Sequence, residues 1–202
     1  AACVSQVGIA FAFARMFHPA MRHAATVRAE LGIPTVFNML GPIAHPARLK
    51  RAVIGVSDPS RLELLADVMR RRGVDRVWLV HGQDGLDELS TSAPSQIVDV
   101  SADRVERRTL HASEVGITEV SGDEIGGGDP VDNARIITEV LAGKPGPDAD
   151  LILLNAAAGL VVSGLHDDLG EALEAARTSI ASGAAERTLT DLRKVTAELV
   201  AP

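Results

Sequence analysis

Aromatic side chains are scarce in this sequence: they make up 2% of its 202 residues, and tyrosine is absent. A core of ordinary size must therefore be built from alanine, valine, leucine and isoleucine. The single cysteine, Cys3, excludes an internal disulfide and a zinc site built on several cysteines. One unpaired cysteine fits a reducing compartment, and we expect the protein to be cytoplasmic.

Long apolar runs and an excess of positive charge are also missing. No run reaches the roughly 18 residues of a membrane span, and the longest candidate, Leu151 to Val162, is interrupted by Asn155 and Gly159 and predicts a buried helix. The net charge of −7 argues against general nucleic-acid binding, which needs a basic face. Residues 1–14 lack the basic start of a signal peptide. No initiator methionine is present, so we expect this chain to be part of a longer protein.

Alternating strand and helix signals predict an α/β fold. The runs Ala52 to Val56 and Arg76 to Val80 are typical of strands, and an amphipathic helix from Pro59 to about Arg72 joins them. Such a strand–helix–strand unit implies a parallel pair. Two further strands are expected as a hairpin at Ile97 to Val100 and Val105 to Leu110. Helices are expected at 130–141, 149–163, 167–182 and 184–199.

The N-terminal part is predicted to contain an extended segment followed by a helix. Gly8 to Phe13 alternates small and large apolar residues, which indicates a strand or a buried extended segment. Pro19 to Leu31 carries apolar residues at a spacing of three to four and predicts a helix that Gly32 and Pro34 end.

The stretch most suggestive of chemistry follows the strand that ends at Val80. It is a glycine-containing loop, residues 81–88, with the adjacent carboxylates Asp87 and Glu88. Ligands of α/β sheets bind beyond the carboxyl ends of strands, and one or two carboxylates with substrate phosphates are a usual set of Mg²⁺ ligands. A solvated acidic turn explains the same residues without a ligand. At this point both interpretations stay open.

Two other candidate sites have competing explanations. Gly126 to Gly128 could cradle a phosphate, but Asp129 followed by Pro130 is a helix cap, and capping is favoured. Arg28 lies beside Val27 and Leu31 at the edge of an apolar face, where a guanidinium is a good bidentate site for a carboxylate. Plain solvation is the alternative for Arg28.

Six motifs, in this order along the chain, together resemble anthranilate phosphoribosyltransferase. They are Phe17-His18-Pro19-Ala20-Met21; Val27-Arg28-x-Glu30-Leu31-Gly32; Thr35-Val36-Phe37-Asn38-x-Leu40-Gly41-Pro42; Val80-His81-Gly82-x-Asp84-Gly85-Leu86-Asp87-Glu88; Gly127-Gly128-Asp129-x-x-x-Asn133-Ala134; and Leu153-Leu154-Asn155-Ala156-Ala157. Each motif alone is weak, and the ordered set is specific.

The resemblance implies transfer of a phosphoribosyl group from phosphoribosyl pyrophosphate to the amine of anthranilate, with release of pyrophosphate, in tryptophan biosynthesis. It implies Mg²⁺ as the cofactor, held by Asp87 and Glu88, and a homodimer as the usual assembly. Arg28 matches the arginine that meets the carboxylate of anthranilate. The full set of residues implied to bind substrate is Arg28, Met21, His18, Gly41 and Pro42.

The same resemblance implies a nucleoside phosphorylase/phosphoribosyltransferase-type fold, with a mixed, largely parallel sheet flanked by helices. Residues 18–45 would belong to a smaller helical domain that lines the anthranilate site, and residues 1–17 and 46–202 to an incomplete α/β domain. The family's glycine-rich pyrophosphate loop does not occur in this sequence, so the chain resembles the C-terminal part of a family member and is expected to be inactive alone.

Two rival functions stay open. One is a pyrimidine nucleoside phosphorylase of the same fold, which lacks this Asp-Glu pair. The other is a nucleic-acid-binding paralogue without enzyme activity, against which the acidic balance and the intact Asp87–Glu88 pair both count.

Overall fold

The computed structural model describes residues 1–12, 17, 27, 30–33, 35, 41, 43, 45, 47 and 49–200. The chain divides into two compact units, one formed by residues 1–49 and 191–202 and the other by residues 50–190. No helix of the described part is long and apolar enough to cross a membrane.

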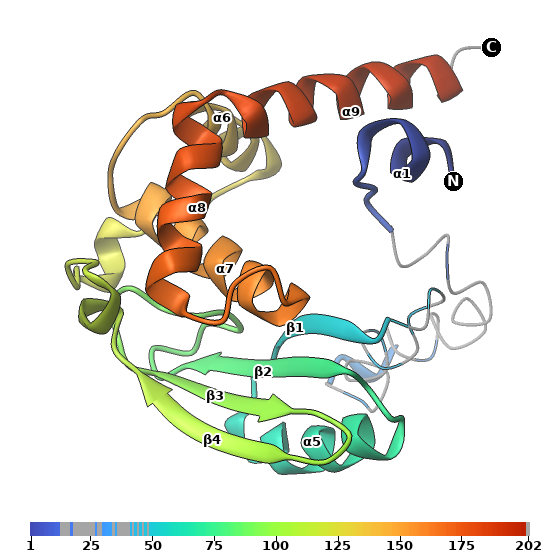
Figure 1. The fold of residues 1–202 in the computed structure, drawn as a ribbon, viewed down its shortest axis with the longest axis vertical. Helices are drawn as coiled ribbons and strands as arrows, with labels where there is room; N and C mark the ends of the chain where they lie inside the picture. The colour runs from blue at the N-terminus through green and yellow to red at the C-terminus, as the bar shows by residue number, and fades with distance from the viewer. Residues whose placement is uncertain are drawn as a thin grey trace. The chain divides into compact units, whose positions relative to one another are not determined.

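The second unit is built on a four-stranded sheet in the order β1-β2-β3-β4 (Figure 1). Its strands are β1 (Arg51–Gly55), β2 (Arg76–Gly82), β3 (Ser95–Val100) and β4 (Val105–Leu110). β1 and β2 are parallel, whereas β2 with β3 and β3 with β4 are antiparallel. The predicted strands, the parallel pair and the hairpin are confirmed.

The α/β fold with a mixed sheet flanked by helices is also confirmed, but parallel pairing does not predominate among the described strands. A parallel neighbour needs a crossover of a dozen or more residues. Only β1 and β2 have a helical crossover, through η2 (Pro59–Arg61) and α5 (Leu62–Arg71). Between β3 and β4, the Ser101 N–H donates to the Arg104 carbonyl at 2.8 Å, and this short turn returns the chain antiparallel.

Helices cover both faces of the sheet (Figure 1). α5 packs against β2 and β3 on one face, and α7 (Pro147–Ser163) and α8 (Leu169–Ala181) lie on the other. Successive residues of a strand point to opposite faces. The central residues 77–80 of β2 are all apolar because both faces of the strand are buried there.

The helix α7 is the centre of the core. Leu154, Ala157, Ala158 and Val161 are at most 1% exposed and belong to the same cluster as Trp78 and its neighbours in the sheet. Burying a leucine or valine side chain stabilises the fold by about 1.5–3 kcal/mol. The predicted buried helix is confirmed, as are the other C-terminal helices: α6 (Pro130–Leu141), α8 and α9 (Ala184–Val200).

The first unit contains α1 (Ala2–Val7), which ends at Gly8 in the left-handed conformation, with φ of 86°. The strand or buried extended segment predicted at 8–13 is wrong for residues 8–12, which form no strand and are not buried; Phe13 lies outside the described residues. An alternating pattern makes a strand only where another strand can pair with it, and here Phe11 is 81% exposed. Val27, Glu30 and Leu31 are helical as predicted. The assignment of 18–45 to a small helical domain stays a prediction.

Candidate functional site

The acidic loop, residues 83–94, connects β2 to β3 and begins at the carboxyl end of β2. Asp87 is exposed, Glu88 is half-buried and Leu89 is completely buried. Gln83 N–H donates to the Pro94 carbonyl at 2.9 Å and closes the base of the loop. The two adjacent carboxylates therefore stand on a loop that Leu89 anchors in the core.

The exposed Asp84 holds this loop together through hydrogen bonds from three of its residues. Its carboxylate accepts hydrogen bonds from the Ser90 hydroxyl, from the Ser92 hydroxyl at 2.5 Å and from the Leu86 N–H at 3.2 Å. Burial by itself would raise the pKa of Asp84, but these hydrogen bonds outweigh burial and lower it. Ser90 is 1% exposed, and its oxygen accepts from the Ser92 N–H at 2.9 Å. Asp84 is thus engaged in holding the loop together.

The carboxylates of Asp87 and Glu88, unlike that of Asp84, have no hydrogen-bonding partner among the described residues. Within the described part of the chain, neither carboxylate receives a hydrogen bond or forms an ion pair. The pKa of Glu88 is raised, first by burial and then by the negative charges of Asp87 and Asp84. This concentration of negative charge lacks a compensating cation among the described residues.

The residues present fit a Mg²⁺ ion that is shared with a substrate. Among the described residues no group of three or more His, Cys, Asp or Glu side chains could hold a metal. Mg²⁺ in phosphate-handling enzymes is usually bound by one or two carboxylates together with substrate phosphates, without a complete protein cage. Asp87 and Glu88 supply such a pair, and their mutual repulsion favours a cation between them.

The loop lies directly against the end of β1. A Cβ atom built on Gly55 would be 1.7 Å from the carbonyl oxygen of Asp87, so only glycine leaves room for the loop at this point. At the end of β2, a Cβ on Gly82 would be 2.5 Å from a carboxylate oxygen of Asp84. The expected location of Asp87 and Glu88, beyond the carboxyl ends of parallel strands, is therefore confirmed.

His81 joins the two parallel strands beneath this loop. The side chain is 6% exposed, and its Nδ1 lies 2.8 Å from the carbonyl oxygen of Val56. Because a carbonyl only accepts, Nδ1 carries the proton. Val56 N–H donates in turn to the Val80 carbonyl at 2.9 Å, so the chain leaving β1 is tied to β2 at two points.

Asn155 of α7 is a contact with the loop that the sequence did not reveal. Its Oδ1 accepts from the Leu89 N–H at 2.9 Å, and its Nδ2 donates to the Leu89 carbonyl at 2.9 Å. The available signal was a single amide within the apolar run of α7, residues 151–162. The sequence located that amide but did not indicate its partner.

The glycine loop before α6 is a helix cap, as favoured. Asp129 accepts from the N–H groups of Val131 at 2.8 Å and Asp132 at 3.0 Å. The Gly126 N–H donates to Asp148 at 2.7 Å, and the Gly128 N–H donates to Asn133 at 3.1 Å. These backbone donors are already occupied by side-chain oxygens, so the segment needs no phosphate.

The residues expected to bind anthranilate are not tested by the structure. His18, Met21, Arg28 and Pro42 lie outside the described residues, and Gly41 is helical and half-buried. The substrate-binding roles of these five residues stay predictions.

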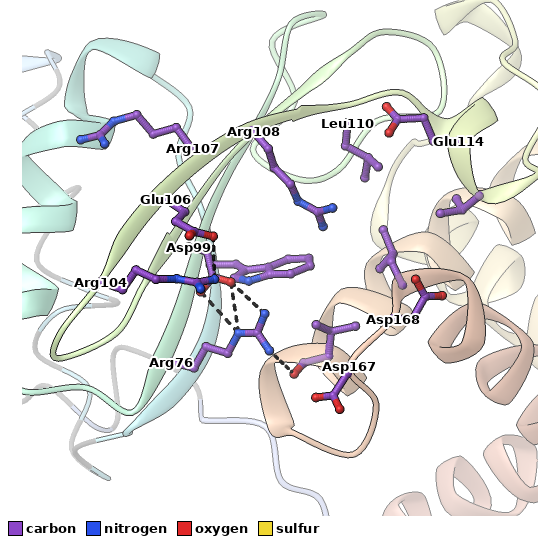
Figure 2. Close-up of a pocket in the computed structure, with 14 residues that line it drawn as sticks. Arg76, Asp99, Arg104, Glu106, Arg107, Arg108, Leu110, Glu114, Asp167 and Asp168 are labelled. Carbon is purple, nitrogen blue, oxygen red and sulfur yellow. Dashed lines mark hydrogen bonds and ion pairs between the residues drawn. The ribbon is translucent and has the colours of Figure 1, made fainter.

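A cavity of about 360 Å³ is lined by residues of β4 and by Arg76 and Trp78 of β2 (Figure 2). Arg76 is paired there with Asp99, at 2.8 Å, and donates to the Val161 carbonyl at 3.2 Å, while Arg104 is paired with Glu106. β2 advances about 3.3 Å per residue, so Arg76 and the acidic loop are roughly 20 Å apart. No residue of the acidic loop lines the cavity, so the cavity is not part of the candidate site. Two of its ion pairs, Arg76 with Asp99 and Arg104 with Glu106, lie within the lining.

Trp78 lies between two arginines in the wall of this cavity. The guanidinium carbons of Arg76 and Arg108 are 5.6 and 4.9 Å from the centre of its ring, which are cation–π distances. In Figure 2 the Arg108 side chain reaches toward the cavity and Arg107 points away from it. Trp78 is 2% exposed and closes the core at this end of the sheet.

Comparisons with known proteins identify the family of this chain. Residues 1–186 match the model of the glycosyl transferase family, a/b domain. An anthranilate phosphoribosyltransferase from Thermomicrobium roseum is 47% identical over 188 residues, which are 92% of this chain and 54% of that protein.

Solved structures of the same enzyme have the same fold. The crystal structure of the Thermus thermophilus protein is 38% identical, with a TM-score of 0.85 over 95% of this chain and 58% of that one. The Saccharomyces cerevisiae enzyme in complex with PRPP and Mg is 31% identical, with a TM-score of 0.78 over 87% of this chain and 51% of that one.

The chain thus spans little more than half the length of these relatives. Within that span, the fold agrees with that of the solved structures. The chain belongs to the glycosyl transferase family with the a/b domain, and the relatives it resembles there are anthranilate phosphoribosyltransferases.

Proposed function

We propose that this chain supplies the metal-binding part of an anthranilate phosphoribosyltransferase. The reaction transfers the phosphoribosyl group of phosphoribosyl pyrophosphate to the amine of anthranilate, giving N-(5-phosphoribosyl)anthranilate and pyrophosphate, a step of tryptophan biosynthesis. The observation that carries the proposal is the uncompensated Asp87–Glu88 pair on the loop beyond β1 and β2. The yeast relative in complex with PRPP and Mg supports the choice of substrate and ion.

The arrangement suits a reaction that needs orientation and charge compensation more than a covalent step. The amine of anthranilate is already a nucleophile, and we assign no acid or base to the chain. Asp87 and Glu88 would hold Mg²⁺, which when bound neutralises the negative charge that develops on the departing pyrophosphate. The rigid backbone around Asp84 and Leu89 fixes where the two carboxylates point.

The remaining contacts are proposed from the resemblance. Arg28 would pair with the carboxylate of anthranilate through two parallel hydrogen bonds. His18, Met21, Gly41 and Pro42 would line the channel through which anthranilate reaches the ribose carbon. A homodimer and a cytoplasmic location are proposed on the same basis.

The test measures product and pyrophosphate with two proteins. One is the 202-residue chain, and the other is the same chain preceded by the N-terminal part of the Thermomicrobium roseum relative. We expect Mg²⁺-dependent product only from the longer protein. Changing both Asp87→Asn and Glu88→Gln in it should lower the rate by about 100-fold or more, since each change removes the negative charge of a ligand.

A matched control removes the same charge elsewhere. Asp103→Asn with Glu106→Gln neutralises two exposed carboxylates around the start of β4 and should leave the rate unchanged. A double variant at Asp87 and Glu88 with an undiminished rate would overturn the assignment of the metal site. If neither protein forms product, the proposed activity is wrong, and cleavage of uridine or thymidine with phosphate and binding of single-stranded DNA test the two rival functions.

A further inference from the structure

The side chain of Asn155 joins helix α7 to the backbone beside Glu88. Oδ1 accepts from the Leu89 N–H and Nδ2 donates to the Leu89 carbonyl, both at 2.9 Å. The second Nδ2 hydrogen is donated to the Leu151 carbonyl, one turn earlier in α7, at 3.0 Å. One amide group therefore satisfies both polar groups of a single loop residue and is itself held by the helix.

The two hydrogen bonds from Asn155 restrict the backbone of Leu89 more tightly than packing of its side chain would. Two hydrogen bonds to one residue, one accepted and one donated, define both the distance and the rotation of the backbone, as in a strand ladder. Leu89 is completely buried, so its N–H and carbonyl would be costly to leave without partners. Glu88 directly precedes Leu89, so the main chain of Glu88 is held in one position as well.

A second observation restricts the loop from the opposite side. Gly55 of β1 approaches so closely that a Cβ there would be 1.7 Å from the Asp87 carbonyl oxygen. The backbone of Asp87 is thus confined by its close approach to β1, and the backbone of Leu89 is hydrogen-bonded to α7. Glu88 lies between these two restraints.

We propose that Asn155 is a positioning residue for the acidic pair, holding the Glu88–Leu89 backbone so that both carboxylates can bind one divalent cation. The proposal rests on the proposed function for its metal-binding role. Groups that orient metal ligands from outside typically contribute about 10-fold to 100-fold to metal affinity or activity. Asn155 would act in this way through the main chain, without touching the ion.

Within α7, the position of Asn155 supports this role. Asn155 is half-buried, and the residues one turn before and after it, Leu151 and Ala158, are buried. An apolar residue would fit such a helix without the cost of burying an amide. The hydrogen bonds to Leu89 account for the amide.

The chain also contains an internal comparison. Asn133 of α6 pairs with both polar groups of Gly128 in the same manner, with both distances 3.1 Å. That pair holds the glycine loop before α6 and does not contact the acidic loop. Asn133→Leu is therefore a matched control for Asn155→Leu.

The test combines two readouts that do not depend on anthranilate transfer. The first is the hydrogen-exchange rate of the Leu89 amide, and the second is the dissociation constant for Mn²⁺, a probe with the same preference for oxygen ligands, measured by electron paramagnetic resonance. In Asn155→Leu we expect Leu89 to exchange roughly 10-fold to 100-fold faster and Mn²⁺ to bind about 10-fold to 100-fold more weakly. Asn133→Leu should accelerate exchange at Gly128 and leave Leu89 unchanged.

Asn155→Asp keeps an acceptor for the Leu89 N–H but loses the donors, and it remains informative if the leucine variant does not fold. We expect intermediate exchange and weakened Mn²⁺ binding in this variant. Unchanged exchange at Leu89 would overturn the proposal, and so would faster exchange with unchanged Mn²⁺ affinity, because Asn155 would then be only a structural contact. Wild-type protein that binds Mn²⁺ but makes no product in the longer form would refute the proposed activity and leave the positioning role supported.

Discussion

Gly55→Ala places one methyl group at the closest approach between β1 and the acidic loop. The new Cβ would lie 1.7 Å from the Asp87 carbonyl oxygen and 2.8 Å from its carbonyl carbon. Since Cβ atoms essentially never come within 3.0 Å of such atoms, the loop must move away by more than about 1 Å. The obstacle is main chain, so rotation of a side chain cannot relieve it.

Two magnitudes follow from this displacement. Overfilling a packed site costs about 1–3 kcal/mol of the free energy of unfolding. A misplacement of about 1 Å at a reacting centre can cost roughly 100-fold in rate. We therefore expect Gly55→Ala to be modestly destabilised and to lose most of its Mg²⁺-dependent activity, because the loop that moves carries Asp87.

Urea denaturation of the 202-residue chain measures the first effect, and product formation by the longer protein measures the second. Gly159→Ala is the control, because a Cβ there meets nothing within 4 Å and the site is an exposed helical one. That change should stabilise the chain by up to about 1 kcal/mol. A Gly55→Ala protein with normal stability and a normal rate would show that the loop is not confined by β1, and the geometric argument would fail.

Two further predictions concern charge. The pKa of Glu88 is raised in the folded chain, so above pH 4.5 the folded state binds more protons than the unfolded state. The free energy of unfolding therefore falls as the pH rises from 4.5 through the folded pKa. Glu88→Gln should be as stable as wild type below this pH range and more stable above it, and urea denaturation from about pH 4 to 8 in which the two proteins do not diverge would contradict the prediction. Asp99→Ala removes the carboxylate bound to the partly buried Arg76 and should cost about 1–3 kcal/mol in urea denaturation. The exposed Arg104–Glu106 pair should contribute under about 1 kcal/mol, and equal losses in Asp99→Ala and Glu106→Ala would refute the distinction.

Local sequence was sufficient for most secondary structure in the described part of the chain. The Asp129–Pro130 cap, the apolar run of α7 and the strand–helix–strand pattern from β1 to β2 each depend on residues close together in the chain. The strand or buried extended segment predicted from Gly8 was wrong for residues 8–12, because an alternating pattern does not reveal whether another element packs or pairs with it. The hairpin of β3 and β4 was predicted from the short turn between them, and the structure confirms it.

The sequence by itself determined the family, the adjacent carboxylates and their place after a buried strand. Only the tertiary structure decided what holds those carboxylates in position. The contacts of Gly55 with Asp87 and of Asn155 with Leu89 join residues 32 and 66 positions apart. Spacing along the chain does not encode such contacts, because they depend on how the sheet and α7 pack together.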